Sequence, residues 1–202
     1  MMTLFVSLTS PFARKARVVL KERGLEERVK QEITNPWQSE ARLLAVNPLS
    51  QIPALVLEDG SALIDSPVIC AYLDELAGPP VLHPQTAPAK WIDRRRTALA
   101  DGMIDAAILV VMESRRPEDK RHAPWSEAQT AKLARGLDAL EAEAESLNST
   151  LTMGTLSIVV ALDYLAFRLP GLNWRAGRPK LAAWYDVVSQ RPSLIATRPV
   201  EG

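Results

Sequence analysis

Residues 47–75 read NPLSQIPALVLEDGSALIDSPVICAYLDE. Within them, PALVLED predicts a strand, Asp59-Gly60 a hairpin turn, and SALI the returning strand. Ser66-Pro67 then predicts a helix start, with the serine as N-cap and the proline in the first turn. The helix that follows ends before Gly78. Its helical spacing predicts a buried face made of Val68, Ile69, Tyr72, Leu73 and Leu76.

The residues before this stretch predict a strand–helix–strand unit. Thr3–Leu8 is an apolar run of strand length. Ser10-Pro11 gives the same helix-start signal, and this helix ends at Gly24. Arg28–Ile33 alternates like a half-buried strand, and residues 34–50 contain a short helical pattern. With the hairpin and its closing helix, the unit predicts a small mixed sheet with helices packed on it.

The second half of the chain predicts only helices. Gly78-Pro79-Pro80 marks a boundary, and residues 78–87 are expected to form a linker. Helical periodicity then recurs in four segments, which are Ile92 to Val110, Leu133 to Leu147, Met153 to Leu169 and Pro179 to Gln190. We therefore expect an α/β domain over residues 1–77 and an all-α domain over residues 88–202.

Composition excludes several classes of protein. The 24 basic and 24 acidic residues of this 202-residue chain cancel, which argues against a nucleic-acid partner. One cysteine excludes an intrachain disulfide, and the distant His83 and His122 argue against a zinc enzyme. No apolar run approaches the roughly 18 residues of a membrane span, and the N-terminus lacks a signal peptide. A cytoplasmic location with no membrane partner and no metal is expected.

Two helix starts are candidate binding positions. At Thr9-Ser10-Pro11-Phe12, unpaired N–H groups and the helix dipole would stabilise a thiolate supplied by a ligand, since Ser10 carries none. At Asp65-Ser66, the carboxylate suits an ammonium, while the hydroxyl and free N–H groups suit a carboxylate. In both places the alternative is plain helix capping.

A third candidate is Gln51-Ile52-Pro53, before the predicted strand. A cis bond to Pro53 would present the Ile52 backbone to a ligand, although only about 5–6% of X-Pro bonds are cis.

Taken together, these motifs resemble the glutathione transferase family. The resemblance covers SPFARKARVVL (residues 10–20), residues 47–75 and WYDVVSQRPSLIATRP (residues 184–199), and is closest to small bacterial serine-type members. It implies a thioredoxin-like first domain, an α-helical second domain and a homodimer. It also implies conjugation of glutathione, as co-substrate, to a small hydrophobic electrophile.

The resemblance assigns roles position by position. Ser10 would be the catalytic hydroxyl facing the glutathione sulfur, although Thr9 at the same turn is also a hydroxyl. Ile52, before a cis Pro53, would pair its backbone with the cysteinyl part, and Asp65 and Ser66 would hold the γ-glutamyl end. The full set of expected glutathione-binding residues is Thr9, Phe12, Gln51, Ile52, Pro53, Asp65 and Ser66. The electrophile would lie in a cleft between the domains, against residues such as Met103, Ala107 and Val110.

Two positions depart from the family pattern. Many members have a lysine where this chain has Gln51, so the loop around Asn35 and Trp37 is expected to share recognition of the glycine carboxylate. Later in the chain, Thr152 is followed by Thr155 where an aspartate is usual. A threonine there accepts a hydrogen bond but cannot complement the helix dipole as a carboxylate would.

The sequence leaves other functions open. Glutaredoxin-like relatives carry Cys-Pro-Tyr-Cys where this chain has Ser10-Pro11-Phe12-Ala13, so protein-based dithiol exchange there is excluded. Cys70, among apolar neighbours, is expected to be an inert buried thiol. A glutathione-dependent peroxidase or thiol reductase could use the same thiolate site, and a non-catalytic interaction protein could use the same fold.

Overall fold

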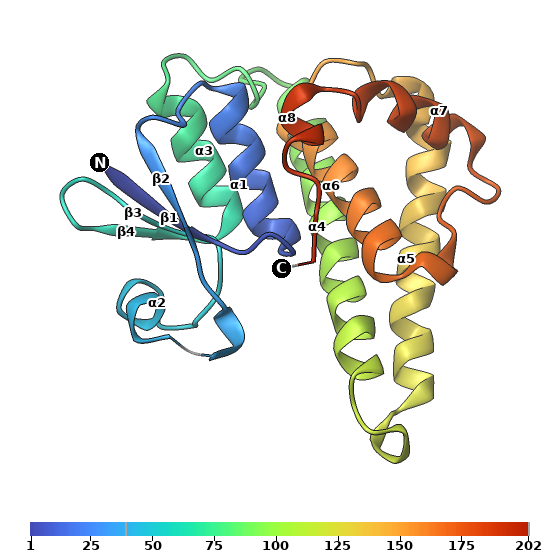
Figure 1. Cartoon of the computed structure of the whole chain (residues 1–202). Coiled ribbons are helices and arrows are strands. Elements are labelled where there is room, and N and C mark those ends of the chain that lie inside the picture. The colour runs from blue at the N-terminus through green and yellow to red at the C-terminus, as the bar shows by residue number, and fades with distance from the viewer. Residues whose placement is uncertain (39, 202) are drawn as a thin grey trace. The chain divides into compact units, whose positions relative to one another are not determined.

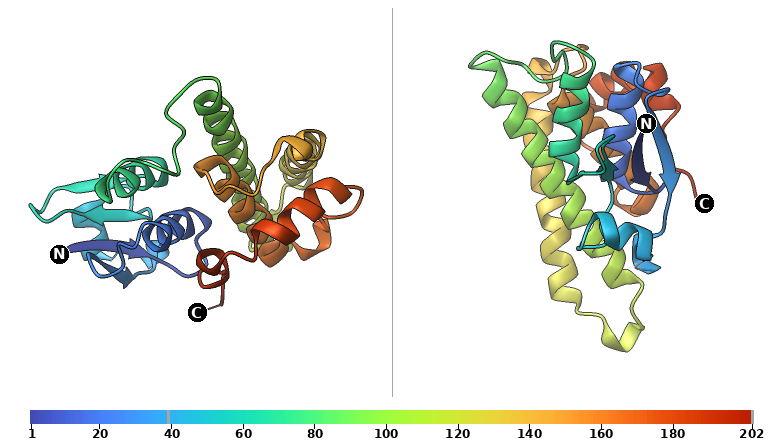
Figure 2. Two further views of the ribbon diagram at one scale, coloured as in Figure 1. Left: turned by 90° about the horizontal axis from the view of Figure 1, so that it is seen from above. Right: turned by 90° about the vertical axis from the view of Figure 1, so that its left-hand side faces the viewer.

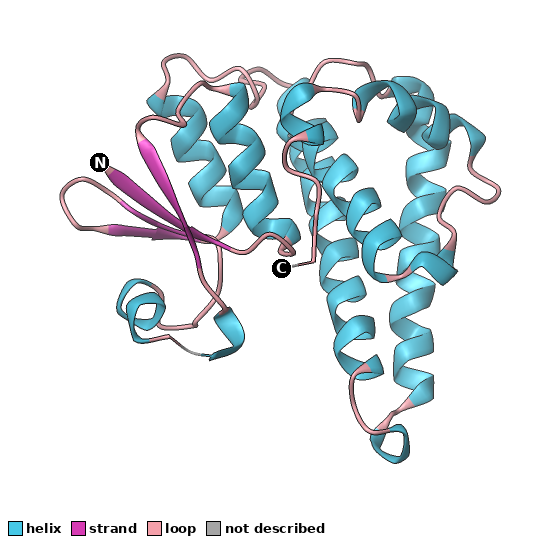
Figure 3. Cartoon of the chain, in the orientation of Figure 1, coloured by secondary structure: helices cyan, strands magenta, loops and turns pink. Residues whose placement is uncertain are grey.

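The computed structural model describes residues 1–38 and 40–201, which form two compact units. The first contains Met1–Pro84 and the segment from Arg191 onward, and the second contains Gln85–Gln190. All described strands lie in the first unit (Figure 3). None of the helices in the described ranges combines the length and apolar character that crossing a bilayer requires.

Four strands form one mixed sheet in the order β2-β1-β3-β4 (Figure 1). β1 (Met2–Val6) pairs in parallel with β2 (Val29–Ile33) and antiparallel with β3 (Ala54–Val56). β3 in turn pairs antiparallel with β4 (Ala62–Ile64). Three strands therefore run in one direction and β3 against them. As a result, the carboxyl ends of β1, β2 and β4 and the amino end of β3 meet at the same end of the sheet.

Helices surround this sheet within the first unit. α1 (Pro11–Glu22) and α3 (Ser66–Leu76) pack side by side, and α8 (Pro192–Ile195) contacts α1 (Figure 1). The short helices η1 (Pro36–Gln38) and α2 (Ala41–Val46) follow β2. The core of the unit includes the fully buried side chains of Leu4, Val6, Ala16, Val19, Leu20, Leu55, Ile69 and Leu73.

The second unit contains one largely buried helix, α6 (Met153–Arg168), which packs against α4 (Ala89–Ser114). α4 also packs against α5 (Ala123–Glu143), and α7 (Pro179–Val188) packs against α5 (Figure 2). Every residue from 153 to 162 is buried, as expected for a helix that is apolar all round. The described residues also contain the 3-10 helices η2 (Glu118–Lys120), η3 (Ala144–Ser146) and η4 (Pro170–Leu172).

The start of α6 is capped from its own segment and from α4. The Thr152 side chain accepts a hydrogen bond from the Thr155 backbone N–H, and the Thr155 hydroxyl accepts one from the Thr152 N–H at 2.8 Å. The buried carboxylate of Asp93 accepts the Gly154 N–H at 2.8 Å. The negative charge that Thr155 cannot supply therefore comes from another helix.

The predicted order of strands and helices is confirmed. Most element ends differ by a few residues. The exception is α5, which begins at Ala123, ten residues before the predicted Leu133, and ends at Glu143.

Of the face predicted to be buried on α3, Ile69 and Leu73 are buried, and Tyr72 and Leu76 are half-buried. The prediction for Val68 is wrong, because its side chain is 49% exposed. The buried face of α3 consists of Ser66, Ile69, Cys70, Leu73 and Asp74. With about 3.6 residues per turn, the Val68 side chain points away from that face. Cys70 is buried, as predicted.

The end of the chain differs from the predicted domain assignment. The sequence analysis placed residues 88–202 in one helical domain, whereas the segment from Arg191 onward packs with the first unit. The buried Arg14 guanidinium donates to the Leu194 carbonyl at 3.1 Å, and Arg191 donates to the Glu22 carboxylate at 2.7 Å. These partners are more than 160 residues apart, so linear periodicity does not reveal them.

Candidate functional site

The sheet topology collects the candidate positions at one end of the first unit. Val6 lies opposite Ile33, and Ala54 lies between Phe5 and Ile64 in the strand register. Four loop segments therefore meet at this end. Three of them leave β1, β2 and β4, and the fourth enters β3. These are residues 7–10, 34–38, 65–66 and 51–53.

Ser10 is the N-cap of α1, as predicted. Its backbone is extended, with φ −77° and ψ 121°, and its Oγ accepts a hydrogen bond from the Ala13 N–H at 3.2 Å. A hydroxyl has one proton to donate besides its acceptor lone pairs. Capping therefore leaves the Ser10 proton available to a ligand atom at the helix start.

The side chains next to Ser10 are partly enclosed. Thr9 and Phe12 are half-buried, and the Phe12 ring lies 5.2 Å from the Nζ of Lys15. Lys15 and Arg14 are 0% and 2% exposed. The sequence analysis did not single out these two buried cations. Their positions in the first turns of the helix after Ser10 were the only signal available.

The segment before β3 presents backbone groups. The Ile52–Pro53 peptide bond is cis, as expected from the resemblance. Ile52 and Pro53 are buried, whereas the Gln51 side chain is exposed. Among the described residues, the Ile52 N–H and C=O form no hydrogen bond with other backbone groups. Both are therefore available to a ligand with a peptide-like backbone.

The start of α3 differs from the prediction in its capping. The N-cap is Asp65, whose carboxylate accepts the Ser66 N–H at 2.7 Å, so the prediction that Ser66 is the N-cap is wrong. Asp65 has φ 72°, a left-handed conformation that is uncommon for a residue with a side chain. This conformation turns the chain one residue earlier than the Ser-Pro signal indicates.

The Ser66 hydroxyl has no role in the capping. The residue is fully buried, and its Oγ has no hydrogen-bond partner among the described residues. An unpaired buried hydroxyl costs about 1–3 kcal/mol. A strained backbone beside an unsatisfied polar group is the pattern found where a ligand completes the structure.

The arrangement suits a short, zwitterionic, peptide-like ligand. The exposed carboxylate of Asp65 can pair with an ammonium, and the Ser66 hydroxyl and the Val68 N–H can hold a carboxylate. Ile52 can pair with the middle of such a ligand. In the described ranges, no group of three or more His, Cys, Asp or Glu side chains is placed to hold a metal ion.

Comparison with known proteins gives the family. Residues 9–76 match the model of the glutathione S-transferase N-terminal domain, and residues 123–187 match that of the C-terminal domain. The chain is 32% identical over 201 residues to the uncharacterized GST-like protein YibF of Escherichia coli (strain K12), covering 98% of each protein. The chain belongs to the glutathione transferase family.

Solved structures of other glutathione transferase family members agree. One from Pseudomonas fluorescens Pf-5, with bound glutathione, is 42% identical, with a TM-score of 0.95 and 100% coverage of both chains. One from Methylobacillus flagellatus KT, with bound GSH, is 37% identical, with a TM-score of 0.88 and coverage of 99% of this chain and 100% of that one. The predicted thioredoxin-like and helical architecture is confirmed.

The topology also brings in a residue that the sequence analysis missed. Thr34 follows β2, is 4% exposed, and has a hydroxyl without a hydrogen-bond partner among the described residues. Its position directly after a strand parallel to β1 was the signal that could have identified it.

In the helical unit, Met103 lies over Gly136 of α5. A Cβ added to Gly136 would lie 2.7 Å from the Met103 Sδ. This places Met103 in the core between α4 and α5, whereas the sequence analysis expected it to face the electrophile.

Proposed function

We propose that this protein binds glutathione at the carboxyl end of β1, stabilises its thiolate and conjugates it to a small hydrophobic electrophile. The single observation that carries the proposal is the buried, unpartnered hydroxyl of Ser66 beside the left-handed Asp65. Relatives that are 42% and 37% identical have been solved with bound glutathione. The site offers contacts for the γ-glutamyl and cysteinyl parts of the tripeptide.

The γ-glutamyl group would occupy the start of α3. Its carboxylate would accept the Ser66 O–H and the Val68 N–H in the first turn of this 11-residue helix, where the helix dipole favours an anion. The Ser66 and Ile69 N–H groups already donate to Asp65, and Pro67 has none. Its ammonium would pair with the exposed Asp65 carboxylate. The ligand would then satisfy the hydroxyl that the protein leaves unpaired.

The cysteinyl part would pair with Ile52. A ligand backbone lying beside Ile52 would use the free N–H and C=O groups, in the manner of a peptide that adds a short strand. Thr9, Phe12, Gln51 and Pro53 are the remaining proposed contacts in this segment and at the start of α1.

Ser10 would act on the sulfur. Its O–H would donate a hydrogen bond to the thiolate, and the amino end of α1 would add the favourable field of the helix dipole. The thiolate sulfur would attack the electrophilic carbon. In a reaction with an activated chloroarene, the new C–S bond forms as chloride leaves.

Isothermal titration with glutathione is the first test. Wild-type binding in the micromolar to low-millimolar range is expected. Ser66→Ala should weaken it by about tenfold or more, because a hydrogen bond to a charged group is lost. Ser157→Ala, which removes another buried hydroxyl from the helical unit, is the matched control and should leave affinity unchanged. No binding by the wild type would favour a non-catalytic interaction protein.

The role of Ser10 is tested by the pH dependence of conjugation. Ser10→Ala is expected to raise the apparent pKa of the bound thiol by about one unit, equivalent to about 1.4 kcal/mol of lost thiolate stabilisation. Thr9→Val is the matched control. A shift in Thr9→Val alone would assign the hydroxyl role to Thr9, and no shift in either variant would remove both hydroxyls from the mechanism. Turnover of peroxides or mixed disulfides, but not of electrophiles, would favour a glutathione-dependent reductase.

A homodimer is proposed from family membership. Size-exclusion chromatography with light scattering should give twice the 22.2 kDa mass of one chain. A mass equal to that of one chain would contradict a homodimer and leave the glutathione proposal intact.

A further inference from the structure

The segments after β2 and before β3 form a corner of the first unit beside the proposed glutathione site. We define the β2–β3 corner as residues 34–38, 40 and 50–51. The Ser50 hydroxyl donates to the Pro36 carbonyl at 3.1 Å, and the Asn35 N–H donates to the Glu40 carboxylate at 3.0 Å. These hydrogen bonds hold the two segments together.

The strand order places this corner opposite the start of α3. Asp65 and Ser66 follow β4 at one side of the sheet, and residues 34–38 of the corner follow β2 at the other side, with β3 and β1 between them. Residues 50–51 of the corner lie before β3. The inference here rests on the proposed function. A glutathione held by Ser66 at its γ-glutamyl end and by Ile52 at its centre would extend its glycine carboxylate toward Gln51 and the corner.

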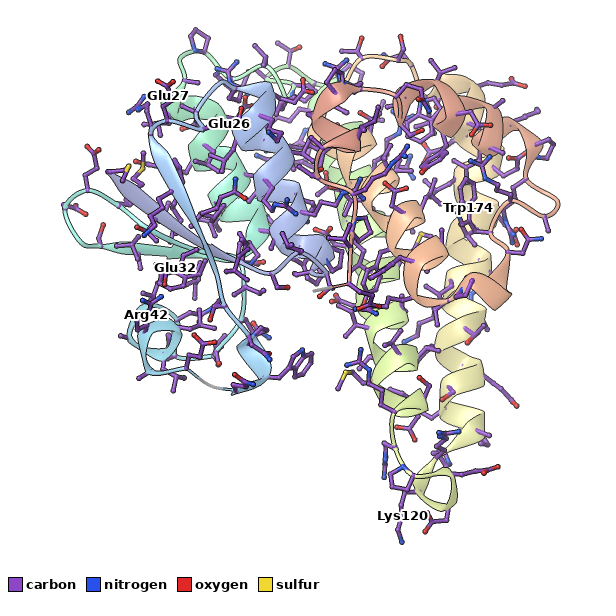
Figure 4. All side chains as sticks on the ribbon, in the orientation of Figure 1. Glu26, Glu27, Glu32, Arg42, Lys120 and Trp174 are labelled. Carbon is purple, nitrogen blue, oxygen red and sulfur yellow. The ribbon has the colours of Figure 1, made fainter. Side chains whose placement is uncertain are left out.

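The corner offers that carboxylate no free cation. Residues 34 to 53 contain only two charged side chains, Glu40 and Arg42, and residues 7–13 contain none. Arg42 forms an ion pair with Glu32 on β2, and Figure 4 shows the two side chains next to each other. Counting Glu32, Glu40 and Arg42, the formal charge around the corner is −1, and Gln51 adds nothing to it.

The hydrogen-bond donors exposed at the corner are neutral. They include the carboxamides of the exposed Gln38 and Gln51 and the Trp37 indole, in a side chain that is 68% exposed. The Trp37 backbone N–H is already bonded to the Asn35 side chain at 3.0 Å. A neutral N–H group bonds a carboxylate more strongly than an amide oxygen, because an ionised acceptor also makes a charge-assisted bond. The carboxylate, however, gives up more hydration when it binds, and a corner with a formal charge of −1 has no free cation to offset that cost. At this exposed position we therefore expect the free carboxylate and its amide to differ little in affinity.

We propose that this site recognises the γ-glutamyl and cysteinyl parts of its thiol but not a charge at the third residue. It would accept glutathione-type thiols whose glycine carboxyl is amidated or joined to an amine, with affinity close to that for glutathione. Gln51 is the residue that determines this specificity.

The test compares glutathione with its glycine amide by isothermal titration at one pH and at 0.15 M salt. Wild-type dissociation constants are expected to agree within about threefold. Gln51→Lys should favour the free acid by about fivefold, the range of an exposed ion pair. Gln51→Met, neutral and of similar length, should keep the ratio near one. Glutathione binding more than about tenfold tighter than the amide by the wild type would overturn the inference.

Further titrations distinguish failure of this inference from failure of the proposed function. If Arg42→Gln weakens binding of the acid but not of the amide, Arg42 leaves Glu32 to bind the carboxylate, and the inference is wrong. If the wild type binds neither thiol, the proposed function itself fails. If Ser66→Ala weakens binding of both thiols equally, the proposed function stands whatever their ratio.

Discussion

Ser66 and Ser157 are both fully buried, and in each the hydroxyl has no hydrogen-bond partner among the described residues. Their surroundings differ. Ser66 lies at the start of α3, beside the Val68 N–H, which is unpaired within the described part of the chain. Ser157 lies in the middle of α6, where all ten residues from 153 to 162 are buried. We therefore expect the same unsatisfied group to serve binding at one position and only to lower stability at the other.

Ser157→Ala is expected to raise the free energy of unfolding by about 1 kcal/mol. The substitution removes an unsatisfied buried hydroxyl and introduces the residue with the highest helix propensity. Urea denaturation of the variant and the wild type measures the difference. A loss of stability would show that the hydroxyl has a partner that the described residues do not include.

At the residue scale, the sequence identifies candidate binding residues more reliably than it predicts the backbone conformation at those residues. Ser10, Ile52-Pro53 and Asp65 are recognisable because their residue types match their positions before helices and strands. The capping at α3 was assigned to the wrong residue because nothing in Asp65-Ser66-Pro67 reports the φ of 72° at Asp65. The free Ser66 hydroxyl follows from that conformation, so it emerged only from the structure.

At the element scale, the start of α6 depends on α4. Asp93 lies 61 residues before Gly154 and accepts its N–H. The capping by Thr152 and Thr155 is a local motif that the sequence predicts. The capping by the Asp93 carboxylate could not be predicted, because an aspartate within a helix normally indicates a solvated face. Sequence periodicity defined both helices but not the contact between their faces.

Asp93→Ala is expected to lower the free energy of unfolding by about 1–3 kcal/mol, because it leaves the buried Gly154 N–H unpaired. Asp93→Asn is the matched variant. It keeps an acceptor oxygen and loses only the charge near the helix start, which is worth about 0.3–1 kcal/mol. Equal losses in the two variants would assign the whole effect to the charge.

At Gly154, α4 and α6 lie too close together for a side chain to fit between them. An added Cβ would lie 2.6 Å from the Asp93 Oδ1 and 2.8 Å from the Asp93 carbonyl oxygen. Gly154→Ala should therefore lower the free energy of unfolding by about 1–3 kcal/mol through overpacking. Gly102→Ala on α4 is the control, because an added Cβ there meets nothing within 4 Å. It should gain up to about 1 kcal/mol from helix propensity. A gain in both variants, by urea denaturation, would contradict close packing at Gly154.

At the scale of the whole molecule, the chain returns to its first unit after the helical unit. Ser193 and Arg191 both donate to the carboxylate of Glu22, near the end of α1. Arg14, on the same helix, donates to the Leu194 carbonyl. The last segment of the chain therefore fixes the helix that begins at Ser10. A partition of the sequence into consecutive domains cannot represent this connection.

Glu22→Gln tests the connection through its dependence on pH. Burial raises the Glu22 pKa, but the hydrogen bonds from Arg191 and Ser193 and the Arg191 charge outweigh it, so the net pKa lies below 4.5. Because the folded-state pKa is lowered, the ionised carboxylate stabilises the fold above the unfolded-state pKa. That stabilisation is lost as the pH falls through the folded-state pKa.

Glu22→Gln is therefore expected to cost about 1–2 kcal/mol at pH 7, as hydrogen bonds to a charged, half-buried group are weakened. The difference from the wild type should shrink as the pH falls through the lowered folded-state pKa of Glu22, where the wild-type carboxylate takes up its proton. Glu26→Gln is the matched control, since Glu26 pairs with Lys21 at the surface and should change stability by less than about 1 kcal/mol. Urea denaturation at pH 7 and pH 3 measures both variants. A Glu22→Gln loss that is equal at the two pH values would assign the effect to packing, and the ion pair would then contribute nothing to holding the end of the chain on α1.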